Sequence, residues 1–136
     1  MYIDQLKKQH TEIARLTKEL QQYTDAAAVT SKAAAIASTL SKLSGVLSVH
    51  LAAEDKYLYP QLSKSEHPEV SRTAQAFFTD MGTLAPVYQD YKQRFLTASR
   101  IAAAPDAFLK DTPAVLGALS ARLQKEDREL YPLVAE

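Results

Sequence analysis

Two segments of this sequence carry side chains whose types and spacing suit the binding of a cation. The segment HLAAEDKYLYP places the imidazole of His50 four residues before the carboxylate of Glu54. Four residues make about one helical turn, so both side chains lie on the same face of a helix. The segment RLQKEDRELYP repeats the pattern, with Arg122 in place of the histidine and Glu126 as the glutamate. The first copy therefore offers two metal-binding side chains, and the second offers one.

The spacing of apolar residues predicts the helices that hold these side chains. Apolar residues in steps of three and four predict an amphipathic helix over residues 3–23, with His10 on its buried face. A second helix is predicted from residue 26 or 30 to residue 59, and it carries the first copy of the pattern. Pro60 is expected to end this helix, because proline cannot donate a backbone hydrogen bond. Residues 61–68 then form a loop.

Two further helices are predicted in the second half of the chain. One covers residues 69–99, with a kink at Pro86 and no histidine or acid on its buried face. Residues 101–105 are expected to be a linker of small residues. The last helix begins at Asp106 or at Thr112, which is a favourable N-cap before a proline.

The predicted fold is all-α, an antiparallel up-down-up-down four-helix bundle that forms one domain over residues 1–136. At about 1.5 Å rise per residue, His10 and His50 lie roughly 10 to 14 Å from the same end of such a bundle. Glu54 and Glu126 lie slightly nearer that end on the same side. The four side chains are therefore expected to converge inside the core.

Two buried carboxylates side by side need a positive charge near them, because burial and mutual repulsion both disfavour their ionised forms. One source is an iron, manganese or zinc ion held by the two imidazoles and the two carboxylates. The other source is Arg122, one turn before Glu126, whose planar guanidinium can donate two hydrogen bonds to a carboxylate. The two sources are not exclusive.

These residues resemble the hemerythrin-like HHE cation-binding domain family. The resemblance rests on His10, on His50-x-x-x-Glu54 followed by Tyr-Leu-Tyr-Pro, and on Glu126 followed by Leu-Tyr-Pro in the last helix. Domains of this family are four-helix bundles that hold an oxygen-bridged pair of irons. One iron takes imidazoles from the first and second helices, and the other takes imidazoles from the third and fourth. One carboxylate from the second helix and one from the fourth bridge them.

The resemblance implies that this chain keeps one metal position and lacks the other. His10 and His50 match the imidazoles of the first iron, and Glu54 and Glu126 match the bridging carboxylates. Arg122 stands where the fourth helix should offer an imidazole. The inward positions of the third helix near this level hold no good ligand; they are Phe77, Met81, Leu84 and Ala85. We therefore expect a single cation, with the guanidinium in place of the second metal.

A single metal changes the expected function. Oxygen carriage of the hemerythrin type takes one electron from each of two irons, so reversible oxygen transport in that form is not expected. The resemblance implies metal binding, a small gas ligand such as O2 or NO, redox sensing or a stress-related role. The alternative is a metal-free helical bundle with a structural or protein-interaction role, in which Arg122 pairs with Glu54 and Glu126. A third interpretation is a non-haem iron enzyme, although the sequence names no substrate and assigns no reaction.

Other polar side chains are interpreted as packing or surface residues. Five tyrosines could include one phenol near the site, but most are expected to pack with their hydroxyls in water; they are Tyr57, Tyr59, Tyr88, Tyr91 and Tyr131. Asp127 is expected on the solvated surface, and His67 in a loop.

Composition excludes several classes of partner and site. The 16 basic and 16 acidic side chains give a formal net charge of zero without a basic cluster, so neither nucleic acid nor a membrane surface is an expected partner. Cysteine is absent, which excludes disulfides and thiolate metal sites. No signal peptide is expected, because the N-terminal residues are amphipathic and charged. No apolar stretch of the ~18 to 20 residues that span a bilayer is expected either, so a cytoplasmic protein is predicted.

Overall fold

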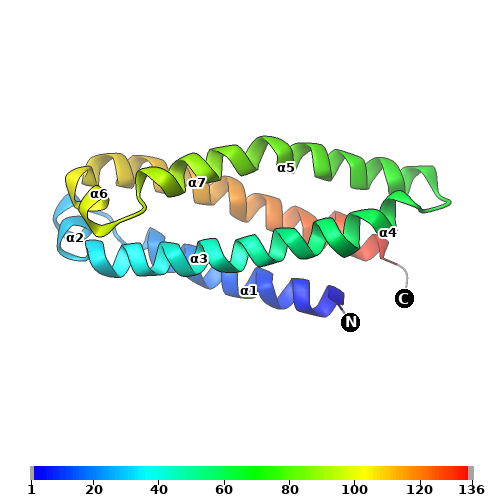
Figure 1. Cartoon of the computed structure of the whole chain (residues 1–136), viewed down its shortest axis with the longest axis horizontal. Helices are drawn as coiled ribbons and strands as arrows, with labels where there is room; N and C mark the ends of the chain where they lie inside the picture. The colour runs from blue at the N-terminus through cyan, green and yellow to red at the C-terminus, as the bar shows by residue number, and fades with distance from the viewer. Residues whose placement is uncertain (1, 135–136) are drawn as a thin grey trace.

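Four long helical segments form the body of the molecule. The computed structural model describes residues 2–134, and these residues contain helices and no strand. Consecutive segments run in opposite directions along the long axis, and both termini lie at the same end (Figure 1). The segments are α1 (Tyr2–Gln21), α3 (Ala33–Ala53) with its continuation, α5 (Pro68–Arg94) and α7 (Pro105–Lys125). The all-α bundle is confirmed.

The second segment does not end at Pro60 as predicted. After α3 the chain forms a π-helix, η1 (Glu54–Leu58), and then continues as α4 (Tyr59–Ser63). In η1 the N–H of Tyr59 bonds to the carbonyl of Glu54, five residues back instead of four. Pro60 falls just after this change of pattern, in the first turn of α4, where a residue without an N–H is tolerated. The connection to α5 is therefore shorter than the loop we predicted.

Two short helices that the sequence did not predict as separate elements lie at the end of the bundle away from the termini. The chain forms α2 (Ala26–Ser31), separated from α3 by Lys32. It also forms α6 (Ala98–Ala103), so the predicted linker and the predicted end of the third helix are wrong. The N–H of Arg100 bonds to the hydroxyl of Thr97, which caps α6, and Ile101 anchors this helix in the core.

The last segment begins at Pro105, next to the first of the two predicted starts. Thr112 is not an N-cap. It lies buried inside α7, where its hydroxyl is 2.7 Å from the hydroxyl of Tyr91 on α5. The segment ends in a second π-helix, η2 (Glu126–Leu130), followed by a 3-10 turn, η3 (Tyr131–Leu133).

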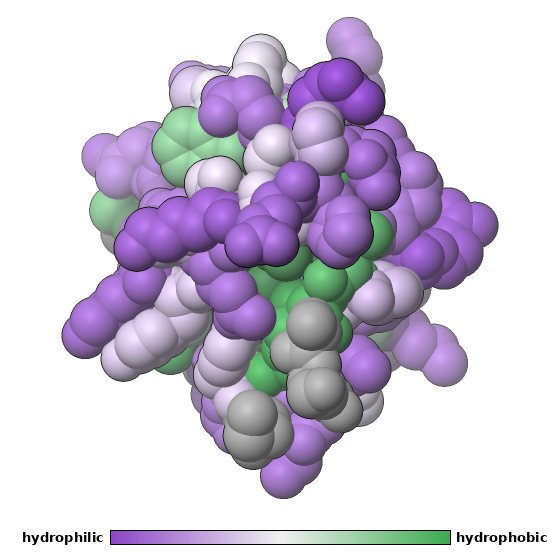
Figure 2. Space-filling view, turned by 90° about the vertical axis from the view of Figure 1, so that its right-hand side faces the viewer, coloured by the Kyte–Doolittle hydropathy of each residue, from purple (hydrophilic) through white to green (hydrophobic). Residues whose placement is uncertain are grey.

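Two apolar clusters make up the core, and a polar layer lies between them. Along α1, His10 separates Leu6 of one cluster from Ile13 of the other. Along α7 and η2, Glu126 lies between Leu123 and Leu130 in the same way. Figure 2 looks at the end with the termini and shows hydrophobic residues at the centre of a largely hydrophilic surface. The apolar clusters therefore close the polar layer from both ends of the bundle.

The second segment has one further property that we did not expect from the sequence. Among the described residues, the helix Ala33–Ser63 is long and apolar enough, by length and composition alone, to cross a membrane. The core helix of a protein that spans no membrane meets the same criterion. In this structure the helix packs against α1 and places His50 and Glu54 in the interior.

Candidate metal centre

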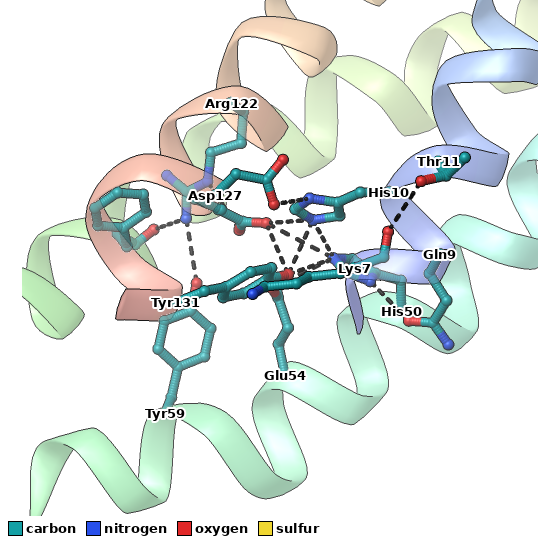
Figure 3. A network of polar contacts seen from close by, with 12 residues as sticks. Lys7, Gln9, His10, Thr11, His50, Glu54, Tyr59, Arg122, Asp127 and Tyr131 are labelled. Carbon is teal, nitrogen blue, oxygen red and sulfur yellow. Dashed lines mark hydrogen bonds and ion pairs between the residues drawn. The ribbon is translucent and has the colours of Figure 1, made fainter. Parts of the chain in front are cut away.

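Three of the long segments bring the four predicted ligands together at one level. His10 comes from α1, and His50 and Glu54 come from α3 and η1 (Figure 3). Glu126 comes from the start of η2. All four side chains are buried. One donor atom from each lies within 4.8 Å of the donor atoms of the other three, in the only such group that the described residues form. The predicted convergence is therefore found in the structure.

The two histidines are oriented by hydrogen bonds at their outer nitrogens. Nδ1 of His10 lies 2.9 Å from Oδ1 of Asp127, and Nδ1 of His50 lies 2.7 Å from Oε1 of Gln9. Both partners are acceptors, so each Nδ1 carries the proton and donates it. The Nε2 atoms then face each other across 3.1 Å. A ligating histidine is commonly held in this way, with its second nitrogen bonded to a carboxylate or carbonyl oxygen.

The carboxylates complete the set of donors. Oε1 of Glu126 lies 3.0 Å from Nε2 of His10, and Oε2 of Glu54 lies 3.3 Å from Nε2 of His50. The other oxygen of Glu54, Oε1, is buried and has no hydrogen-bond partner among the described residues. A buried carboxylate oxygen without a partner is costly. It is a free donor position on Glu54.

Burial and hydrogen bonding shift the pKa values of these groups in opposite directions. Burial alone would lower the pKa of His50, but hydrogen bonds to Glu126 and Glu54 raise it to about 9. Burial alone would raise the pKa of Glu126, but hydrogen bonds with His10 and His50 lower it to about 2. The pKa of Glu54 is raised, chiefly by burial and also by the charge of Glu126. The carboxylates thus draw positive charge into the site, which a metal ion would supply in place of protons.

The whole chain matches a known family. The family model described as the hemerythrin HHE cation binding domain matches residues 1–134. The chain belongs to this family. A search of curated proteins and a search of solved structures found no match. The match, together with the buried His/Glu cluster, indicates a metal-binding helical protein.

In this hemerythrin HHE domain the guanidinium of Arg122 occupies the other side of Glu126. Nε of Arg122 donates to Oε2 of Glu126 at 3.2 Å, and Nη2 donates to the carbonyl oxygen of Phe77 at 2.5 Å and to the hydroxyl of Tyr59 at 3.2 Å. The ring of Phe77 lies 4.5 Å from Cζ of Arg122, within range of a cation–π contact. A fixed positive charge is therefore packed and hydrogen-bonded beside Glu126, on the side away from His10.

The described residues form one group of possible metal donors. Two imidazole nitrogens and two carboxylates suit iron, manganese or zinc, and the free oxygen of Glu54 and the facing Nε2 atoms are donor positions for such an ion. The buried residues of α5 offer no histidine or acid; they are Ala74, Phe77, Tyr88 and Tyr91. His67 is exposed at the N-cap of α5 and lies outside the cluster.

Two residues of the site were not predicted from the sequence, and a third, Tyr131, was only one of several tyrosines considered. Asp127 was expected on the solvated surface, but its carboxylate holds His10, and 46% of its side chain stays exposed. Gln9 precedes His10, and nothing in the sequence pairs it with a histidine of another helix. Tyr131 was expected to keep its hydroxyl in water, yet it is buried among the four ligands. The only feature of the sequence that singled out Tyr131 is that it holds the same position in the second copy as Tyr59 holds in the first.

The two sides of the centre can be named by the nitrogen-bearing residues that fill them. We call His10, His50 and Tyr131 the histidine half. We call Arg122, Tyr59 and the carbonyl of Phe77 the arginine half. Glu126 faces both halves, with Oε1 toward His10 and Oε2 toward Arg122.

Proposed function

We propose that this chain binds one iron ion in the histidine half and uses it to sense a small gas, O2 or NO, or the redox state of the cytoplasm. The ligands are His10, His50, Glu54 and Glu126. One observation carries the proposal: two imidazole Nε2 atoms face each other at 3.1 Å while both Nδ1 atoms are bound to acceptors. Two lone pairs in that position repel each other unless a proton or a metal ion lies between them. Manganese or zinc would satisfy the same donors.

The arginine half supports a count of one metal. A guanidinium keeps its charge at any physiological pH, and here it already neutralises Glu126 and is bound to Tyr59 and Phe77. A second ion beside it would meet a positive charge and too few ligands. Oxygen carriage that draws one electron from each of two irons is therefore outside the proposal.

The residues around the site suit a small ligand. A bound iron would supply a redox-active centre with positions left open by four protein ligands. Asp127 and Gln9 hold the two imidazoles in place. A cavity of about 200 Å³ reaches Glu54 from the side of α5. Most of its lining is apolar and comprises Leu51, Phe78, Met81, Gly82 and Ala85 beside Asp55 and Tyr59. Such a path favours a small uncharged molecule over a polar substrate.

The test is the metal content of the chain. The protein is expressed with added iron, purified without a nickel column and analysed for metal. We expect about one iron per chain, and its loss in His50→Ala while helical content remains. His67→Ala is the matched control and should keep its iron, because His67 lies outside the site. Two irons per chain would contradict the single site, and no metal in any sample would favour a metal-free structural role.

Gas sensing has its own readout. Adding NO or O2 to the reduced, iron-loaded chain should change its visible absorption spectrum, and His50→Ala should show no such change. If iron binds and neither gas alters the spectrum, the sensing role is wrong and the metal site stands.

A further inference from the structure

The hydroxyl of Tyr131 lies at the centre of the four candidate ligands. Its oxygen is 2.9 Å from Nε2 of His10 and 2.8 Å from Oε2 of Glu54. It is 3.4 Å both from Nε2 of His50 and from Oε1 of Glu126. The phenol thus contacts one donor atom of every member of the set.

One phenol cannot satisfy all four of these atoms. A tyrosine hydroxyl has a single proton to donate, and the atoms around it are lone-pair donors when the imidazoles are neutral and the carboxylates are ionised. An oxygen that shares its position with four metal-binding atoms is itself in a position to bind the same ion. The ring is 97% buried and stacks on the ring of His10 at a centroid distance of 5.1 Å, so the hydroxyl is held in place.

The local backbone explains how a residue five positions after Glu126 reaches the same point. In an α-helix with 3.6 residues per turn, residues five apart point about 140° away from each other. Here η2 is a π-helix, and the N–H of Tyr131 bonds to the carbonyl of Glu126 across the wider turn. The wider turn brings Tyr131 round toward the face of Glu126. π-turns of this kind are often found at functional sites.

The equivalent tyrosine of the first copy does something different. Tyr59 also follows a π-helix, η1, but its hydroxyl accepts a hydrogen bond from Nη2 of Arg122. No contact between Tyr59 and the two histidines is found among the described residues. The chain therefore provides two buried tyrosines at matching positions, and only Tyr131 lies among the donors.

We infer that Tyr131 is a fifth protein ligand of the metal, bound through its phenolate oxygen. The inference rests on the single-metal site proposed above. When the ion binds, the phenol O–H bond breaks, the proton leaves to solvent, and the oxygen donates an electron pair to the ion, with no change of oxidation state. Glu54, Glu126 and Tyr131 then bring three negative charges. Three anionic oxygen donors match ferric iron better than a divalent ion.

The test compares Tyr131→Phe with Tyr59→Phe in protein loaded with ferric iron. A phenolate bound to ferric iron gives a visible charge-transfer band and tyrosinate vibrations in the resonance Raman spectrum. We expect both in the wild type and in Tyr59→Phe, and neither in Tyr131→Phe. Tyr131→Phe should still bind about one iron per chain, at least about tenfold more weakly, since even outer partners of ligands matter that much.

Failure of this inference is distinguishable from failure of the proposed function. Iron bound by the wild type without the band, or a band that persists in Tyr131→Phe, would overturn Tyr131 as a ligand and leave the metal site intact. Absence of iron from the wild type would overturn both. If Tyr131→Phe does not fold, resonance Raman spectra of Tyr59→Phe with isotopically labelled tyrosine show whether a tyrosinate is bound when Tyr59 is absent, and loss of the tyrosinate signal in that variant would overturn Tyr131 as the ligand.

Discussion

The two copies of the repeated segment build the two halves of the centre from one backbone plan. In each copy a glutamate begins a π-helix, and a tyrosine and a proline follow it. In each copy the residue four positions before the glutamate contacts it: His50 with Glu54 at 3.3 Å, and Arg122 with Glu126 at 3.2 Å. The copies differ in the group that contacts the glutamate. The imidazole has a lone pair to offer a cation, whereas the guanidinium is itself the cation.

The two tyrosines of the repeated segment also contact different halves of the centre. Tyr131, from the second copy, lies beside His10 and His50, while Tyr59, from the first copy, bonds to Arg122. The tyrosine of each copy therefore lies in the half that contains the histidine or arginine of the other copy. In the proposed single-metal centre, the guanidinium of Arg122 and the ring of Phe77 fill the side of Glu126 that faces away from His10. The arginine half should therefore stabilise the fold, and the histidine half should bind the ligand.

The largest expected effect comes from removing the fixed charge. Arg122→Leu leaves Glu126, the carbonyl of Phe77 and the hydroxyl of Tyr59 without their donor. Breaking a buried ion pair from one side costs about 3–5 kcal/mol. Urea denaturation of the metal-free protein measures this loss, with the exposed Arg128→Leu as the control. A loss below about 1 kcal/mol would mean that the arginine half does not stabilise the fold.

Neutralising the two glutamates should separate stability from metal binding. Glu126→Gln weakens contacts to both halves and should cost about 1.5–3 kcal/mol, the range for hydrogen bonds to charged groups. Glu54 contacts only the histidine half. We therefore expect Glu54→Gln to lose iron while the free energy of unfolding changes by less than about 1 kcal/mol. Denaturation with a chelator present, paired with metal analysis, compares them. Equal stability losses would contradict the division into halves.

The hydrogen bond between His10 and Asp127 can be tested with Asp55, the equivalent of Asp127 in the first copy, as the control. Asp127→Asn should lower iron affinity by about 10- to 100-fold without changing the number of bound ions, because Asp127 orients the imidazole of His10. Asp55 holds the same position in the first copy, is exposed and makes no hydrogen bond to a histidine, so Asp55→Asn should leave the affinity unchanged. Competition with a coloured chelator measures both, and a similar decrease in the two variants would refute the role of Asp127.

The smallest effect is expected at Tyr59. Tyr59→Phe removes one acceptor from Arg122, which keeps its bonds to Glu126 and Phe77. The stability cost should be about 0.5–1.5 kcal/mol, the usual value of one hydrogen bond, and iron affinity should not change. Thermal unfolding and metal titration check the two parts. A marked loss of iron would show that the two halves are not separate.

Sequence reasoning found the four clustered side chains because they follow the helical period. His10, His50, Glu54 and Glu126 continue apolar stripes spaced by three and four residues, and an antiparallel bundle brings those stripes to one level. The same reasoning missed Tyr131, because a π-helix shifts the residues after it off the 3.6-residue period. The wrong helix end at Pro60 has the same cause on the first copy.

Other differences between the prediction and the structure arise from tertiary contacts, which a local sequence pattern does not indicate. Gln9 and Asp127 become part of the site only because their neighbours in space are histidines of other segments. Thr112 has the local features of an N-cap, yet it lies inside α7 and pairs with Tyr91 of α5. The short helix α6 replaces a predicted linker because Ile101 is fully buried in the core.

Anomalous X-ray scattering at the iron edge, from crystals of the chain loaded with excess iron, tests the division of the centre most directly. We expect one peak, bounded by His10, His50, Glu54 and Glu126, and none beside Arg122. A second peak next to the guanidinium, or no peak among the four ligands, would contradict it.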